Sequence, residues 1–450
     1  MQEKLFDLPP SVDPKPRQSS GGGEDSSAAA KAAPRIRTPN RGQIELRSVD
    51  LESLIAPDHR VRVVWDFVVG LDLQDFYAKI RVVEGGPGRD ATDPRVLLAL
   101  WLYATLEGVG SARALDRLTM QHDAYRWICG GVPTNYHTLA DFRVEHAEAL
   151  DRILTTSVAT LLSEGLVTME RVAQDGIRVR ASAGAASFRR RPTLEEGLRE
   201  AEQQLEALRR ELEEDPAATS RRQAAARERA CEERKERIKQ ALAQMPAAEA
   251  KKSQKDKDKA RTSTTDPEAR VMKMADGGFR PAYNGQFAVD TATQVVVGVE
   301  VSSEGSDQGQ MSPMLGQLGR RYGKVPKECL VDGGFSSLAE IKAGTDLGTT
   351  VYAPVAKPKD ATRDRYAPCP GDSDAVAQWR SRMGTEAAKE VYKSRAATVE
   401  CVNAHVRNRG LTRLLVRGTT KVRATLLWQA LAHNLLRAMQ LHPVSALATA

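Results

Sequence analysis

The chain has 450 residues, of which 41% are hydrophobic, and it carries 66 Lys and Arg against 59 Asp and Glu. This length and apolar content indicate a soluble globular protein of two or three domains. No apolar run reaches the roughly 18 residues that span a bilayer, and the N-terminus lacks the apolar core of a signal peptide. We therefore expect a cytoplasmic protein with no membrane partner.

Cysteine usage and charge narrow the class further. The five cysteines are far apart and form no CxxC pair, so neither a structural zinc site nor a disulfide framework is indicated. The net charge of +7 favours a polyanionic partner, although it is modest for this length. Its distribution is more informative, because arginines concentrate in FRRRP, at 188–192, and in the stretch 403–423.

The first 165 residues divide into a polar tail and a helical domain. Residues 1–40 are rich in Pro, Ser, Gly and Ala and are predicted to be disordered. Residues 41–165 predict about four helices, one of them capped by Asp93. Two short helices around a glycine turn are compatible with a helix-turn-helix that enters the major groove of DNA, and equally with a bundle that only packs. We take 41–165 as a helical DNA-binding domain.

A β-strand is predicted next, and it carries one residue that does not fit. In RVAQDGIRVRAS, at 171–182, the alternation places Asp175 on the same face as Ile177 and Val179. A carboxylate on an apolar face is costly unless it is paired or coordinates a metal. Asp175 is therefore a candidate ligand.

Residues 190–265 interrupt the strand pattern with a charged helical insertion. Leucines from Leu194 to Leu212 recur at spacings of three, four and seven, and a similar seam follows the break DPAATS. This pattern predicts an antiparallel helical hairpin with arms of roughly 30 Å, followed by a Lys-rich linker.

The remaining segments alternate between strands and helices. Strands are predicted at about 284–290 and 294–302, joined by a turn, and again at ECLVDGG and TTVYAPV, with helices between and after them. The order predicts an α/β fold whose mixed sheet has antiparallel strands first and parallel strands later. We assign 166–189 and 266–442 to this domain.

Two further acids complete a candidate site. Asp332 is predicted at the carboxyl end of a buried strand, where open α/β sheets place their ligands, and Glu400 lies on the long helix that follows. On an ideal helix Arg407 points within about 20° of Glu400. Three carboxylates form a hard-oxygen ligand set that suits two Mg²⁺ or Mn²⁺ ions and the two-metal chemistry of phosphodiester cleavage.

The sequence resembles DDE-type transposases of bacterial insertion sequences. The resemblance covers about residues 40–440 and is carried by these stretches: VAQDGIRVRASAGAASFRR, TDPEARVMKMADGGFRPAYNGQFAVD, LVDGGFSS, YKSRAATVECVNAHVRNRGLTRLLVRG, and YHTLADFR in the helical domain. It implies a ribonuclease-H-like catalytic domain flanked by helices, with the hairpin inserted after the first strand. It also implies a Tyr-Arg-Glu-Lys signature near the third acid.

Carried over by position, Asp175, Asp332 and Glu400 match the catalytic, metal-binding acids. The residues expected to contact DNA are Tyr392, Arg395 and Arg407 of the signature, with Arg143, Arg189 and Arg190. Two departures from the signature stand out. Arg407 replaces the usual lysine, and four residues instead of three separate Arg395 from Glu400, which on an ideal helix places them about 140° apart.

The resemblance implies an enzyme that cleaves the ends of its own element and joins them to target DNA, acting as a homodimer on paired terminal repeats near the bacterial nucleoid. The alternatives are a DNA-binding relative that no longer cleaves and another nuclease of the same fold. The terminal repeat, the target site and the fate of the second strand do not follow from the sequence.

Overall fold

The computed structural model describes residues 39, 42, 44, 50–82, 89–214, 220–358, 360 and 362–441. The tail predicted for residues 1–40 falls, except for residue 39, outside this part of the chain. Residues 49–450 cluster as one compact unit.

The N-terminal region is helical, as predicted, but has more helices than four. The segments 111–128 and 137–165, each expected to form one helix, both divide in two. His122 caps a new helix by accepting from the Ala124 N–H at 3.3 Å, and the chain breaks again at His146. Asn135 caps the helix that follows it. The elements are η1 Glu52–Leu54, α1 Arg60–Val69, α2 Gln74–Tyr77, α3 Pro94–Leu106, α4 Ala112–Gln121, α5 Asp123–Cys129, α6 Tyr136–Glu145 and α7 Ala147–Ser163.

Helix α3 is the centre of this region. Asp93 accepts from the Arg95 N–H at 2.8 Å, and Pro94 occupies the first helical position, where its missing N–H costs nothing. Nearly every residue of α3 is buried, which its continuous apolar sequence requires. The Trp101 indole donates to the Leu139 carbonyl at 2.9 Å and so fixes α6 against α3.

A mixed sheet forms the second layer. The central strand β1 is antiparallel to β5 and parallel to β7, and β7 is parallel to β8. Strands β4 and β6 are antiparallel to β5. The predicted turn is present, with Asp290 accepting from Thr293 N at 3.0 Å, whereas β4 was not predicted. The strands are β1 Arg171–Arg180, β4 Arg270–Lys273, β5 Phe279–Asp290, β6 Val296–Ser302, β7 Glu328–Leu330 and β8 Thr350–Tyr352.

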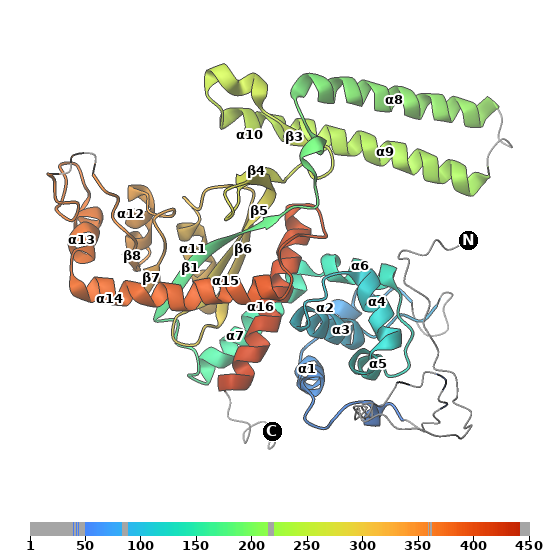
Figure 1. The fold of residues 1–450 in the computed structure, drawn as a ribbon, viewed down its shortest axis with the longest axis horizontal. Helices are drawn as coiled ribbons and strands as arrows, with labels where there is room; N and C mark the ends of the chain where they lie inside the picture. Colours follow the sequence, from blue (N-terminus) through green and yellow to red (C-terminus); the bar gives the residue numbers. More distant parts are fainter. Residues whose placement is uncertain are drawn as a thin grey trace, which may run out of the picture. The chain divides into compact units, whose positions relative to one another are not determined.

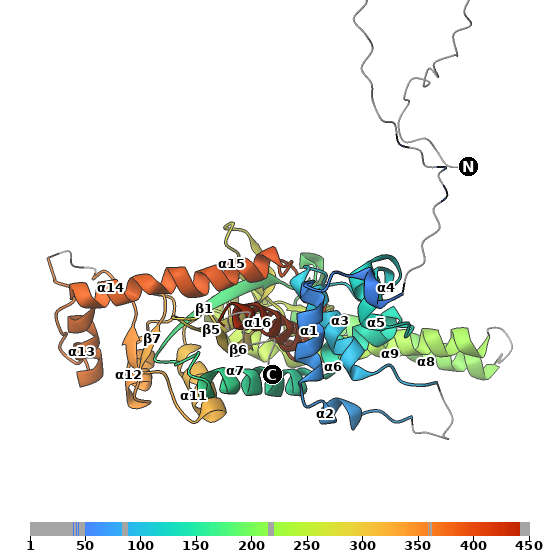
Figure 2. The same cartoon turned by 90° about the horizontal axis from the view of Figure 1, so that it is seen from below.

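Helices cover both faces of the sheet. Figure 2 shows α14 and α15 along one face, with α7 and α11 on the other. Between α14 and α15 the chain forms one π-helical turn, η4, which contacts β1 and β5. The elements are α11 Met311–Tyr322, α12 Leu338–Asp346, α13 Asp374–Met383, α14 Glu386–Arg395, η4 Ala396–Glu400, α15 Cys401–Asn408 and α16 Thr419–Leu441.

Helix α16 joins the two regions. It packs against α3, α6 and α7 of the helical region and against β6 of the sheet. The Asn434 side chain pairs with both backbone groups of Val296, accepting from N at 2.8 Å and donating to O at 2.8 Å. This amide therefore continues the hydrogen bonding of β6 beyond the strand itself.

The insertion after β1 folds on its own small core. Helices α8 Arg191–Glu214 and α9 Arg221–Ala243 lie side by side in Figure 1, and α10 Met245–Ala250 and η3 Gln254–Lys259 follow them. The Lys-rich stretch predicted as a linker forms η3. At the base, β2 Phe188–Arg189 pairs antiparallel with β3 Thr262–Ser263. The buried apolar residues here form a cluster separate from the main core: Leu194, Ala201, Ile238, Ala241, Met245 and Ala260.

Within the residues that the structure describes, no helix is both long enough and apolar enough to cross a bilayer.

Candidate active site

Asp175 lies on the central strand β1, under the helix that carries Glu400. Its carboxylate accepts from the Asn403 amide at 3.0 Å, and its other oxygen lies 3.8 Å from Arg395 Nη1. The side chain is 18% exposed. The partners of Asp175 thus come from α15 and α14, more than 200 residues further along the chain.

The electrostatics of Asp175 show which other acids are near it. Burial raises the pKa of Asp175 to about 6, and the Arg395 charge opposes this shift. The carboxylates of Asp332 and Asp307 raise the pKa further. Three acidic side chains are therefore within electrostatic reach of one another at the centre of the sheet.

Asp332 lies just beyond the carboxyl end of β7. One of its oxygens accepts from the Gly334 N–H at 2.7 Å. A Cβ at Gly334 would come within 2.9 Å of that oxygen and 3.7 Å of an Asp307 oxygen. The glycine therefore leaves the space between these two carboxylates open, which a larger residue would fill.

Glu400 reaches the same place through an irregular helix. Its carboxylate lies 2.8 Å from Arg395 Nη2, although the two residues are five apart. On a regular α-helix they would face different directions, but the π-helical turn η4 closes after five residues and brings them together. The prediction that Arg395 and Glu400 lie about 140° apart is therefore wrong, because the π turn accommodates the additional residue between them.

Of the other signature residues, Tyr392 joins the group and Arg407 stands apart. Burial raises the pKa of Tyr392, a hydrogen bond and charge from Arg395 lower it, and Asp332 and Glu400 raise it. Arg407 lies on α15 with its side chain exposed. In the described part of the chain it forms no ion pair within 4.0 Å.

Arg395 is the centre of this arrangement. Its side chain is only 12% exposed, lies between Asp175 and Glu400, and buries an Nη1 group without a hydrogen-bond partner. Among the described residues, no three His, Cys, Asp or Glu side chains are close enough together to hold a metal ion as they stand. The donors are nevertheless all carboxylate oxygens, the type that Mg²⁺ and Mn²⁺ prefer.

Asp307 is a residue of this site that the sequence did not reveal. It is 8% exposed and accepts from Asn284 Nδ2 at 2.7 Å and Gln286 Nε2 at 2.8 Å, with Arg178 at 3.4 Å. A Cβ at Gly176 would lie 2.2 Å from its carboxylate. The available signal was YNGQF, where Asn284 and Gln286 place two amides on one face of a buried strand.

The arginines expected to contact DNA occupy different environments. Arg143 is half-buried, donates to the Gly110 carbonyl, and lies 5.0 Å from the Trp101 ring. Arg189 and Arg190 are exposed at the base of the hairpin.

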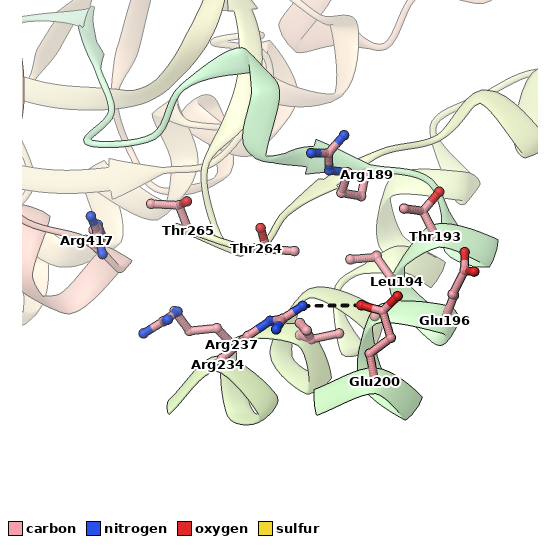
Figure 3. Close-up of a pocket in the computed structure, with 12 residues that line it drawn as sticks. Arg189, Thr193, Leu194, Glu196, Glu200, Arg234, Arg237, Thr264, Thr265 and Arg417 are labelled. Carbon is pink, nitrogen blue, oxygen red and sulfur yellow. Dashed lines mark hydrogen bonds and ion pairs between the residues drawn. The ribbon is translucent and has the colours of Figure 1, made fainter. Parts of the chain in front are cut away.

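Arg189 lines a basic pocket at the base of the hairpin, shown in Figure 3. The cavity measures about 750 Å³. Its arginines come from separate elements: Arg189 from β2, Arg234 and Arg237 from α9, and Arg417 from the loop before α16. Only one of the two glutamates in the lining, Glu200, contacts an arginine of the pocket, Arg234 at 3.4 Å.

Together, the helical region, the mixed sheet and the central carboxylates define an α/β protein with an acidic site at its sheet. Two family models match the chain. The Transposase DDE domain matches residues 362–439, and the Transposase domain (DUF772) matches residues 49–145. These matches identify a transposase domain of the DDE type in the first of these ranges and a further transposase domain in the helical region.

The first matched range contains Tyr392, Arg395, Glu400 and Arg407, and the second contains α1 to α6. Asp175 and Asp332 lie outside both ranges. The search of curated proteins gave no significant match, and neither did the search of solved structures.

Proposed function

We propose that the chain is an active transposase that cleaves DNA at the ends of an insertion sequence and transfers the strands to target DNA. One observation carries the proposal. Asp175 on the central strand and Asp332 beyond the neighbouring parallel strand lie within electrostatic reach of the helix that bears Tyr392, Arg395 and Glu400. The grouping gathers acids from distant parts of the chain, and only two of them, Asp175 and Glu400, lie within 4.0 Å of Arg395 among the described residues.

The strand order supports a ribonuclease-H-like catalytic domain. The hydrogen-bonded sequence β6-β5-β1-β7-β8 has three antiparallel strands, then two strands parallel to β1. In this arrangement the carboxyl end of β7 and the middle of β1 lie side by side. Of the two aspartates that the proposal needs, Asp175 is on β1 and Asp332 lies just beyond the end of β7.

Asp175, Asp332 and Glu400 would hold two Mg²⁺ or Mn²⁺ ions. Bound there, the ions would activate the attacking oxygen and stabilise the leaving oxygen at phosphorus. The protein contributes orientation: Asn403 holds the Asp175 carboxylate by its 3.0 Å hydrogen bond. Arg395 balances the charge of Asp175 and Glu400 until it turns toward a phosphate of the DNA, and Tyr392 flanks it.

Binding of a DNA duplex also requires basic residues outside the acidic site, along its sugar-phosphate backbone. The pocket at the base of the hairpin, with its four arginines, is suited to the sugar-phosphate backbone. We propose that Arg189 and Arg190 act here, on the terminal inverted repeat, and that two copies of the chain act together on paired ends. We propose that the exposed Arg407 of α15 contacts a DNA phosphate as well.

The test is nicking of a duplex that carries the DNA flanking the gene, with Mg²⁺ or Mn²⁺ present. We expect specific nicks at the repeat ends, and we expect Asp175→Ala, Asp332→Ala and Glu400→Ala each to abolish nicking while leaving DNA affinity nearly unchanged. Binding without nicking by the unaltered protein would indicate a non-cleaving relative. Cleavage directed by DNA structure or by hybrids would indicate another nuclease.

A further inference from the structure

A second basic pocket lies between the helical region and the segment that follows α15. The α3–α4 turn, including Gly108 and Gly110, forms one wall, and residues 409–416 form another. Trp428 and Gln429 of α16 close it. The cavity measures about 480 Å³, and we refer to it as the α3–α4 pocket.

This pocket contains arginines but no acid. Arg143, Arg409 and Arg413 line it, and among the described residues no Asp or Glu does. Arg143 Nε and Arg409 Nη1 are buried without a hydrogen-bond partner. Gln429, 7% exposed, also buries its side-chain oxygen without a partner. Three residues that line this cavity therefore each bury an unsatisfied polar group.

Unpaired buried cations are unusual, because desolvation of a charge is costly unless an opposite charge compensates it. Burial lowers the pKa of Arg143 and of Arg409, and the Arg60 charge adds to the effect at Arg409. Arg380, in contrast, has a carboxylate partner, Asp372 at 2.8 Å. In the α3–α4 pocket this compensating group is missing.

The backbone adds to the positive potential. Gly110 and Ser111, which immediately precede the ten-residue helix α4, line the pocket, so the positive end of its dipole is directed there. Gly108 and Gly410 both have positive φ, 74° and 86°, and a Cβ at Gly410 would lie 3.0 Å from the Gly108 carbonyl. The two glycines thus let the walls approach closely enough to bring Arg143 and Arg409 into one cavity.

We propose that the α3–α4 pocket binds a phosphodiester of the DNA backbone through Arg143 and Arg409, with the adjoining sugar against Leu411, Leu415 and Val416. The proposal rests on the proposed function, which makes DNA the substrate. The cavity exceeds the volume of one phosphate, and its apolar wall suits a deoxyribose. The bound strand would link the helical region directly to the segment that follows the signature helix.

The experiment compares Arg409→Gln and Arg409→Lys with Arg320→Gln, which removes an exposed arginine of α11. Fluorescence anisotropy of a labelled duplex, measured over a range of NaCl concentrations with the full-length protein, gives affinity and salt dependence. Arg409→Gln should weaken binding by about tenfold, the loss expected for one charge-assisted hydrogen bond. It should also reduce the slope of log K against log salt by about 0.9.

The thermal midpoint of the DNA-free protein distinguishes an arginine that binds DNA from one that stabilises the fold. Removing an uncompensated charge should leave the midpoint of Arg409→Gln unchanged or raise it, whereas loss of a structural arginine would lower it. Arg409→Lys should retain most of the salt slope. Arg320→Gln should match the unaltered protein in affinity and stability.

Two outcomes would overturn the proposal while the proposed function stands. One is an unaltered salt slope in Arg409→Gln together with normal nicking by the parent protein. The other is a lowered thermal midpoint of Arg409→Gln in the absence of DNA. A measurement with inorganic phosphate distinguishes a site for free phosphate from a site for a phosphate of the DNA backbone. Stabilisation of the protein by millimolar phosphate with no change in DNA affinity on Arg409→Gln would identify a site for free phosphate and overturn the DNA assignment. Failure of the parent protein to bind or nick any DNA would instead refute the function itself.

Discussion

Arg395 explains how three acids can share one region before any cation arrives. Its guanidinium contacts Glu400 at 2.8 Å and lies 3.8 Å from Asp175, so one positive charge partly neutralises two negative ones. Without it, the carboxylates of Asp175 and Asp332 would repel each other in a partly buried setting. The arginine that the resemblance assigns to DNA therefore also stabilises the free protein.

Asp307 offers a test of the site at the level of one residue. Asp307→Ala removes the acceptor for Asn284 and Gln286 and leaves Arg178 without its carboxylate. We expect it to lower the free energy of unfolding by about 3 kcal/mol, because buried polar groups lose their partners. Urea unfolding followed by circular dichroism measures this change.

The matched control is Asp346→Ala, which removes an exposed carboxylate that pairs with Lys342. We expect this change to cost less than about 0.5 kcal/mol. An equal loss in the two variants would contradict a special role for Asp307.

The residues of the site differ in how well they could be predicted from the sequence. Asp175 was predictable because a charge interrupts an alternating strand, and Glu400 because the resemblance places it on a helix. Asp307 was not, because DQG before a helix reads as an ordinary turn or cap. Its importance depends on Asn284 and Gln286, which approach it only when β5 pairs with β1.

At the level of elements, the π-helical turn η4 is the decisive irregularity. One additional residue between Arg395 and Glu400 would rotate the rest of the helix by about 100° if the helix were regular. The π turn absorbs that residue, so α15 keeps Val402 and Val406 buried. Insertions of this kind are common at functional sites.

Deleting the exposed Ala396 tests this interpretation. The deletion converts five residues into one α-helical turn and leaves Arg395 and Glu400 four apart, still on one face. We expect a folded protein whose thermal midpoint and nicking activity are close to those of the parent. Differential scanning calorimetry and the nicking assay measure the two properties.

Deleting Ala404, an exposed residue of the regular helix α15, is the comparison. It turns Val406 out of the core, and we expect the thermal midpoint to fall by several degrees, since a buried valine contributes on the order of 2 kcal/mol. Equal behaviour of the two deletions would show that the π turn has no such compensating role.

Helices and strands that depend on tertiary contacts were predicted less well than those that local sequence determines. The strongly periodic or apolar segments, such as α3 and the hairpin helices, were predicted because local pattern alone determines them. The short strand β4 was not, because Arg270–Lys273 has no alternation of its own and is held by pairing with β5. Likewise the breaks at His122 and His146 depend on side-chain caps and chain packing.

For the whole molecule, the presence of two separate cores predicts two separable parts. The hairpin buries Leu194, Ile238 and Met245 among themselves, apart from the main core. Joining Arg190 to Arg261 through a short Gly-Ser turn removes the hairpin but keeps the base at β2 and β3. We expect the main core to unfold at nearly the same temperature in calorimetry.

DNA binding should respond differently to this excision. The pocket at the hairpin base loses Arg234 and Arg237, so the salt slope of DNA affinity should fall by up to about 1.8, the value for two phosphate contacts. The double substitution of these two arginines by Gln in the intact hairpin is the control and should give the same slope. Unchanged DNA binding in both variants would show that the hairpin does not contact the DNA.

The position of α16 also has a consequence for synthesis on the ribosome. This helix, which packs on both the sheet and the helical region, is made after every other described element, and Glu400 shortly before it. A nascent chain can bury its first strands only incompletely while these segments are still in the exit tunnel. The proposed site can therefore form only after α16 has been made, and we expect nascent chains that lack α16 to be unable to cleave DNA.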